Sequence, residues 1–148
     1  MNLTKEYVQG IFSLLDKGQN KEFFKNVAED VKWKVMGTHP LAGVYTSKAA
    51  FLAATFEKLA KVLEGGVVLK VDNILISGPF AIVEMHALAH IKDGGDFNNT
   101  YCWITKFEKG VIIEVRAYVD SALVAKAMSY QSNDKTPSKQ VMKAVQSG

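Results

Sequence analysis

The chain has 148 residues, 48% of them hydrophobic and 22% charged, which fits a single domain with one core. Its net charge is +3 and its Lys and Arg residues do not cluster, so nucleic acid is not an expected partner. No apolar run approaches the roughly 20 residues of a membrane span, and the N-terminal segment MNLTKEYVQG lacks the apolar region of a signal peptide. With one cysteine and no disulfide framework, we expect a soluble, cytoplasmic protein without membrane contact.

The first half of the chain is predicted to be mainly helical. Residues 4–17 carry apolar side chains at helical spacing, and Thr4 is placed to cap this helix. A short second helix is expected over residues 20–28 and a longer third helix over residues 47–64. Between them, residues 31–37 alternate apolar and polar side chains, which indicates a strand.

The second half is predicted to be a meander of long strands. Short glycine-containing turns separate apolar segments at residues 67–77, 80–92, 97–108 and 111–120. A final helix is expected over residues 122–130. The fold class is therefore α+β, with three N-terminal helices packed on one face of a strongly curved antiparallel sheet. A pocket is expected where the helices leave the concave face uncovered.

The C-terminal segment differs in composition from the rest of the chain. Residues 1–130 are expected to form the folded domain. The segment QSNDKTPS then reads as a linker, and residues 139–145 carry a short apolar stripe typical of a helix. Residues 131–148 are accordingly predicted to be a linker with a short tail helix.

The hairpin at residues 97–120 is the predicted wall of the pocket. With Lys109-Gly110 as a two-residue turn, Tyr118 would face Tyr101 across the two strands. One face of the hairpin then carries aromatic rings, an arginine and an acid, and the other carries Cys102 and mainly aliphatic side chains. Cys102 itself is expected to be a packed thiol rather than a nucleophile.

Two segments of the chain resemble a known family. The sequences VKWKVMGTHPLAGVY and NNTYCWITKFEKGVIIEVRAYVDSALV, with helices before and between them, are similar to those of SnoaL-like proteins. These proteins belong to the nuclear transport factor 2-like (ketosteroid isomerase-like) superfamily, and the resemblance covers about residues 4–128. It implies a cone-shaped α+β barrel with an internal pocket. The superfamily includes isomerases, polyketide cyclases, dehydratases, epoxide hydrolases and proteins that only bind, so the fold alone does not determine the activity.

The resemblance implies that Asp120 is a catalytic acid or base. In SnoaL-like cyclases and in limonene epoxide hydrolase, an aspartate near the end of the last strand faces the pocket, and Asp120 matches that position. Burial among aromatic rings would raise the pKa of its carboxyl and suit it to proton transfer. The alternative is that Asp120 caps the last helix. His86 is a candidate partner for an acid–base dyad, and the alternative is a hydrogen-bonded or surface histidine.

Other catalytic groups of these relatives are not matched. The tyrosine and asparagine of limonene epoxide hydrolase fall on Trp33 and Val35, and its arginine and second aspartate fall near Glu84 and His86. The base of ketosteroid isomerase falls near Lys34 or Val35. Epoxide hydrolysis and steroid isomerisation by those routes are therefore not expected.

The remaining candidate residues are expected to bind substrate. Each of them also has a purely structural alternative. Aromatic rings on a sheet face often belong to the core, a loop histidine before proline such as His39 is often simply exposed, and an arginine at a sheet rim often makes a structural ion pair. The histidines lack metal-ligand spacing, and neither a metal nor an organic cofactor is expected. The expected substrate-binding residues are Trp33, His39, Phe56, Tyr101, Trp103, Arg116 and Tyr118.

Three functions fit these observations. The first is a cofactor-independent isomerase, cyclase or dehydratase that acts by acid–base chemistry on a small hydrophobic carbonyl or polycyclic metabolite. The second is a non-catalytic, dimeric binding protein for an apolar small molecule. In the third, the pocket is filled by its own side chains and the sheet is a dimerisation surface. A homodimer through the outer sheet face is expected because Ile104, Ile113, Val115 and Val119 are too apolar for a wet surface.

Overall fold

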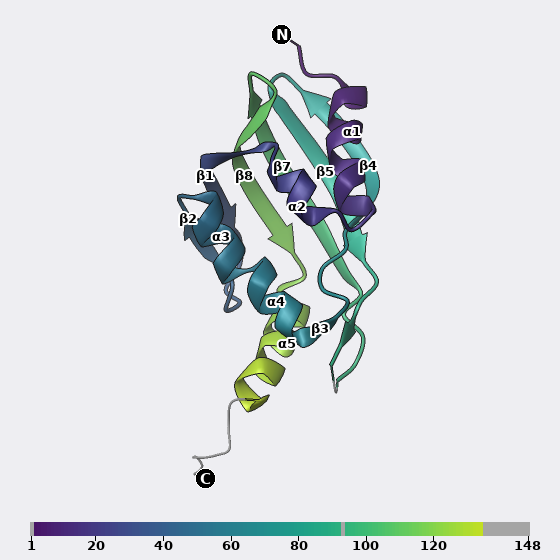
Figure 1. The fold of residues 1–148 in the computed structure, drawn as a ribbon, viewed down its shortest axis with the longest axis vertical. Helices are drawn as coiled ribbons and strands as arrows, with labels where there is room; N and C mark the ends of the chain where they lie inside the picture. The colour runs from purple at the N-terminus through teal and green to yellow at the C-terminus, as the bar shows by residue number, and fades with distance from the viewer. Residues whose placement is uncertain (1, 93, 135–148) are drawn as a thin grey trace.

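Figure 1 shows the computed structural model of the chain, which describes residues 2–92 and 94–134. Five α-helices and eight strands are assigned in these residues. In chain order they are α1 (Lys5–Asp16), α2 (Asn20–Phe24), β1 (Val27–Val35), β2 (Gly43–Tyr45), α3 (Lys48–Ala54), α4 (Phe56–Val62), β3 (Leu63–Glu64), β4 (Lys70–Ser77), β5 (Phe80–Ala87), β6 (His90–Ile91), β7 (Asn99–Glu108), β8 (Val111–Val119) and α5 (Ser121–Asp134).

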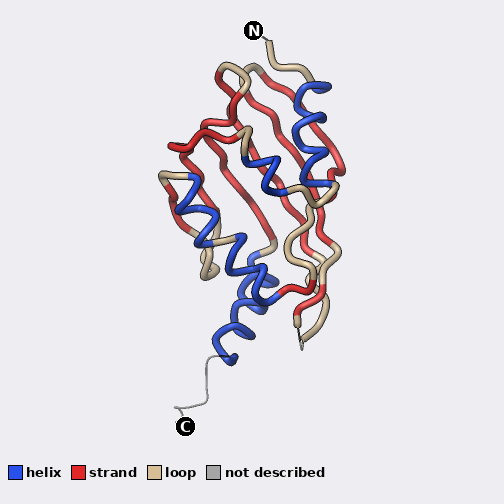
Figure 2. The backbone as a smooth tube through the Cα atoms, in the orientation of Figure 1, coloured by secondary structure: helices blue, strands red, loops and turns tan. Residues whose placement is uncertain are grey.

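A six-stranded curved sheet has the order β2-β1-β8-β7-β5-β4. The predicted meander is confirmed, because β4, β5, β7 and β8 pair antiparallel with their neighbours. β1 joins this meander parallel to β8, so the sheet is mixed rather than wholly antiparallel. Figure 2 shows helices α1 to α4 on one side of the large sheet, which confirms the predicted α+β arrangement. Strands β3 and β6 form a separate two-stranded pair.

Helix α1 begins and ends where the sequence predicts. The Thr4 hydroxyl accepts a hydrogen bond from the Tyr7 N–H at 3.1 Å, which satisfies one of the free donors of the first turn. The apolar stripe of the helix is buried, and Phe12 and Leu15 are completely inaccessible. This stripe anchors the helix against the concave side of the sheet.

The predicted helix over residues 47–64 is divided into two helices. Ser47 caps α3 as expected, but Thr55 has φ −125° and ψ −79° and interrupts the helix before α4 begins at Phe56. The Thr55 hydroxyl donates to the Phe51 carbonyl at 2.7 Å. Such back-bonding by a threonine competes with regular helical geometry, and its sequence signal is weak.

The register of the β7–β8 hairpin differs from the prediction by one residue. The two-residue turn at Lys109-Gly110 is present, with φ values of 52° and 80°. Phe107 pairs with Ile112, but the next pair is Lys106 with Glu114, so Ile113 is an extra residue in β8. A one-residue bulge reverses the face of every later side chain in its strand. Tyr101 therefore pairs with Val119, and not with Tyr118 as predicted.

The bulge gives the sheet an apolar inner face on β8. Val115 and Ala117 are buried, and together with Val119 they lie on the side of Tyr101 and Trp103. The prediction that Val115 and Val119 belong to the outer face was therefore wrong.

The end of the described chain is helical. Helix α5 continues to Asp134, four residues into the segment predicted as a linker. The rest of that segment, with the helix predicted at residues 139–145, lies outside the described residues. In the part of the chain that the structure describes, no helix is long and apolar enough to cross a membrane.

Candidate functional site

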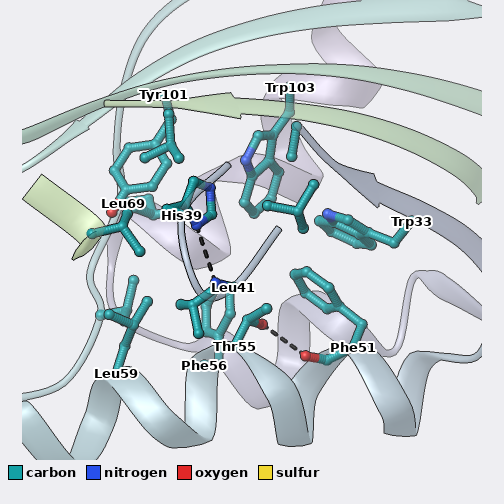
Figure 3. A pocket seen from close by; sticks show the side chains of 15 residues that line it. Trp33, His39, Leu41, Phe51, Thr55, Phe56, Leu59, Leu69, Tyr101 and Trp103 are labelled. Carbon is teal, nitrogen blue, oxygen red and sulfur yellow. Dashed lines mark hydrogen bonds between the residues drawn. The ribbon is translucent and has the colours of Figure 1, made fainter. Parts of the chain in front are cut away.

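A small apolar cavity lies between α3, α4 and the inner face of the sheet, and its volume is about 50 Å³ (Figure 3). Strands β1, β7 and β8, the loop over residues 36–42, the segment over residues 67–69 and α5 complete its walls. Five of the predicted substrate-binding residues line it, namely Trp33, His39, Phe56, Tyr101 and Trp103. The other lining residues are Val35, Leu41, Phe51, Thr55, Leu59, Val67, Leu69, Ala117, Val119 and Val124.

The tryptophans fill space as well as lining the cavity. Trp33 stacks on Phe51 with ring centroids 3.9 Å apart and planes at 18°. Trp103 meets it edge to face at 5.0 Å. Because Trp33 is fully inaccessible and Trp103 is 3% exposed, both rings belong to the hydrophobic core.

Tyr101 brings an unpaired polar group to this apolar site. Its ring is half-buried, but its hydroxyl oxygen is buried and has no hydrogen-bond partner within residues 2–92 and 94–134. Burial raises the pKa of this phenol well above its ordinary value. The group therefore stays protonated as a hydrogen-bond donor. Buried polar groups nearly always have partners, so an unpaired one in a cavity is a candidate ligand contact.

His39 lies deeper than a loop histidine usually does. It is 7% exposed, and Figure 3 shows its ring between Tyr101 and Trp103. The Leu41 N–H donates to Nδ1 at 3.2 Å, so the proton resides on Nε2, which donates to the Met36 carbonyl at 3.1 Å. Burial lowers the pKa of His39, which favours this neutral tautomer.

The loop that carries His39 is packed closely against α5. Gly37 has φ 112°, a conformation that strongly favours glycine. A Cβ at this position would lie 2.6 Å from the Ser121 Oγ, so a larger residue would push the loop away from the helix. The loop thus closes one side of the cavity.

Asp120 does not line the cavity, contrary to the expectation from the resemblance. It is exposed, and its Oδ1 accepts hydrogen bonds from the N–H groups of Ala122 at 3.1 Å and Leu123 at 3.4 Å. This is the helix-capping alternative. The buried Asn99, which was not predicted as a site residue, accepts from the Asp120 N–H at 3.1 Å and holds the backbone there.

The predicted dyad of His86 and Asp120 is not formed. His86 Nδ1 lies 2.8 Å from the Asp72 carboxylate on the outer side of the sheet. Asp72 is the extra residue of a bulge in β4, which explains why simple alternation did not reveal this pair.

Arg116 and Tyr118 also lie away from the cavity. The bulge at Ile113 turns both side chains to the outer face, where Tyr118 is 42% exposed. The Arg116 guanidinium lies over the Phe80 ring at 5.8 Å. Their prediction as pocket residues depended on the wrong register.

Solved structures show the fold of the chain. A nuclear transport factor 2-like (NTF2-like) protein from Burkholderia thailandensis superposes with a TM-score of 0.71 at 22% identity, covering 83% of this chain and 95% of that one. A Mesorhizobium loti protein provisionally named a SnoaL-like polyketide cyclase gives a TM-score of 0.64 at 20% identity, covering 78% and 99%. The chain has the NTF2-like fold.

This result confirms the predicted resemblance for the NTF2-like architecture. Among curated proteins, the dimerizing cyclase phiC of Fungal sp. (strain ATCC 74256) is 27% identical over 114 residues, which are 72% of this chain. The chain spans about half the length of this relative, 49%. No protein-family model matches the sequence.

Proposed function

We propose that the protein is a cyclase- or isomerase-type enzyme that acts, without a cofactor, on a small hydrophobic carbonyl compound. The observation that supports this most directly is the unpaired Tyr101 hydroxyl in a mainly apolar cavity. The similarity to a protein named as a cyclase supports the same reaction class.

Tyr101 would stabilise charge on the substrate carbonyl. When a proton leaves the carbon next to a carbonyl, negative charge develops on the carbonyl oxygen. A donor already in place stabilises that charge strongly in a water-poor site. The raised pKa of Tyr101 suits this role, because the phenol keeps its proton while it donates.

His39 would move the proton in place of the predicted Asp120. Its Nδ1 carries the lone pair, and it must release the Leu41 N–H to accept the proton from carbon. The enolate carbon would then attack a second carbonyl, which gives cyclisation, or take a proton at another carbon, which gives isomerisation. In either case the imidazolium returns its proton to the product, so His39 ends in its starting state.

The cavity is smaller than the substrates it would have to hold. A volume of about 50 Å³ is well below the roughly 300–1,000 Å³ of typical ligand pockets. A substrate must therefore displace part of the wall when it binds.

Replacing Tyr101 by phenylalanine should separate activity from stability. The test substrate is 2-tetralone, an apolar bicyclic ketone, and the measurement would be deuterium exchange next to its carbonyl, followed by NMR in D₂O. Wild-type protein should accelerate exchange, and Tyr101→Phe should reduce the acceleration by about 10²-fold, as for loss of one oxyanion donor. The same variant should be more stable by roughly 1 kcal/mol, because it no longer buries an unpaired hydroxyl.

Asp120→Asn is the control, since this exposed cap should leave the exchange rate nearly unchanged. If Asp120→Asn abolishes exchange while Tyr101→Phe does not, the proposed roles are wrong.

The alternative is a non-catalytic binding protein for an apolar molecule. It is favoured by the hydrogen bonds at both nitrogens of His39 and by the position of Asp120 outside the cavity. Binding of 2-tetralone without any acceleration of exchange would support this alternative over the enzyme.

We also propose a homodimer through the outer face of the sheet. Leu75, Ile82 and Ile104 are neighbours in one cross-strand row, and Leu75 is 54% exposed. Such a row on a sheet face is typical of an interface. Light scattering at micromolar concentration should give the mass of two chains, and Ile104→Lys should give the mass of one. A monomeric wild-type protein would count against this interface.

A further inference from the structure

A surface groove adjoins the small cavity. Its volume is about 540 Å³, and it lies between α2, the pair α3 and α4, and the turn that precedes β4. Phe56 and Val67 line both the groove and the cavity. These two side chains therefore form the shared wall between a groove of ligand size and a cavity that is too small for a ligand.

Val67 is the fixed part of this wall. Its side chain is 6% exposed, and its carbonyl accepts a hydrogen bond from the Asn20 Nδ2 at 2.7 Å. This bond ties the segment to α2, on the far side of the groove. A displacement of Val67 would break it and disturb the groove itself.

Phe56 is the part of the wall that can move. Its ring is only half-buried and meets Phe24 edge to face at 5.3 Å and Phe51 at 5.9 Å. It is the first residue of α4, directly after the break at Thr55. Because the Thr55 hydroxyl is directed to Phe51, α4 has no side-chain cap at this end. The ring is thus held by ring contacts, and a rotation about its side-chain bonds can release it.

We propose that Phe56 is the gate through which an apolar ligand passes from the groove into the cavity. With the ring displaced, the two spaces join and reach the size of ordinary ligand pockets. This inference rests on the proposed function, because it assumes a ligand that contacts Tyr101. Phe56 is then the residue that sets the upper size of that ligand.

The charges of the groove favour an uncharged ligand. Three lysines and one acid, Lys21, Lys25, Lys48 and Glu57, line the groove. Two of the three lysines already have acidic partners, since Lys25 lies 3.0 Å from Glu22 and Lys48 lies 3.1 Å from Glu29. Lys48 also donates to the carbonyls of Phe24 and Val27. An anion would have to compete with these partners, whereas a neutral ring compound would not. The ligand class is therefore a neutral, apolar ring compound that carries a carbonyl.

Tryptophan fluorescence provides a test that needs no ligand. The chain has two tryptophans, and both line the cavity. Acrylamide is small, neutral and a quencher on contact, so its quenching constant measures access to the cavity. Wild-type protein should be quenched weakly. Phe56→Ala should be quenched several-fold more strongly, and Phe56→Leu should be intermediate.

Two matched variants control for loosening of the core. Leu52→Ala enlarges only the groove, and Leu59→Ala enlarges only the cavity, because each residue lines one space alone. Both should stay close to wild type in quenching, although Leu59→Ala removes a buried side chain and should lower stability. If either control matches Phe56→Ala, or if Phe56→Ala is quenched as weakly as wild type, Phe56 is not the gate.

The ligand experiment separates this inference from the proposed function. Association of 2-tetralone with the Tyr101→Phe protein should become faster when Phe56→Ala is added, whether or not the wild type catalyses exchange. Faster association without any catalysis would support Phe56 as the gate and contradict the proposed enzymatic function. Catalysis with no effect of Phe56→Ala on quenching or association would contradict the role of Phe56 as a gate and support the proposed enzymatic function.

Discussion

Trp33→Ala is expected to lower the free energy of unfolding by about 3–5 kcal/mol, the range for deletion of a large buried aromatic ring. Trp33 is completely inaccessible and lies between the sheet and α3. Its removal would end the stack with Phe51 at 3.9 Å and the edge contact with Trp103 at 5.0 Å. Neither helix α3 nor strand β8 can collapse easily into the space, because both are fixed by their own neighbours.

The measurement is urea unfolding followed by circular dichroism, so that loss of the tryptophan does not remove the signal. Trp33→Phe is the matched variant and should lose much less stability. It keeps an aromatic ring, and it also removes the Trp33 Nε1 group, which is buried without a partner in the described part of the chain. A loss below about 1 kcal/mol in Trp33→Ala would mean that this ring is not central to the core.

His39→Phe should have the second-largest effect and lower the free energy of unfolding by about 2–3 kcal/mol at pH 7.5. Two backbone groups would lose their hydrogen-bond partner in this variant. The imidazole ties the loop together by bonding to both Met36 and Leu41, and the Leu41 bond is buried. A phenyl ring fills similar space but satisfies neither group. Thermal or urea unfolding at fixed pH measures the difference. His39→Gln, which can restore one of the bonds, should recover part of the loss.

The same residue predicts a dependence of stability on pH. The folded chain binds the His39 proton less readily than the unfolded chain, because burial lowers the folded pKa below 6.5. The unfolded state is therefore favoured as the pH falls through 6.5 toward the lower folded pKa, and stability should decrease over that interval.

The pH effect is measured as the difference between wild type and His39→Phe at each pH. His86 and His90 are present in both proteins, so their contributions cancel in this difference. The stability advantage of wild type should shrink on acidification. An advantage that grows as the pH falls would show that His39 is charged in the folded state.

The sequence predicted the helices and strands of the fold better than it predicted the register between the strands. Turn residues such as Lys109-Gly110 have strong local preferences, and the strands beside them were predicted correctly. The bulge at Ile113 has only a faint signal. Ile112 and Val115 are both buried although three positions separate them, which breaks the period of two. The prediction extended simple alternation through this point and therefore assigned Arg116 and Tyr118 to the wrong face of the sheet.

The candidate site was predicted in part for the same reason. Trp33, Tyr101 and Trp103 lie on strands whose alternation is regular, and all three line the cavity. Asp120 follows the bulged strand and precedes a helix, where a cap and a pocket acid have the same sequence pattern. The hydrogen bonds of His39 depend on the path of its loop, which local preferences do not determine.

The extra residue at Ile113 also has a consequence for how such a site can change over evolution. Deletion of this one residue would straighten the strand and leave every later pair as it is, because Ile113 is the residue without a partner in the ladder. A slip of β8 by one residue that brings Ile113 into the ladder would instead reverse the faces of all later side chains. Arg116 and Tyr118 would then pair with Trp103 and Tyr101, and Val115 and Ala117 would face outward. A change of register at constant chain length therefore exchanges an apolar chamber for a charged one. Substitutions that remove the bulge, more than deletion of the extra residue, would be an economical route from one chemistry to another on this scaffold.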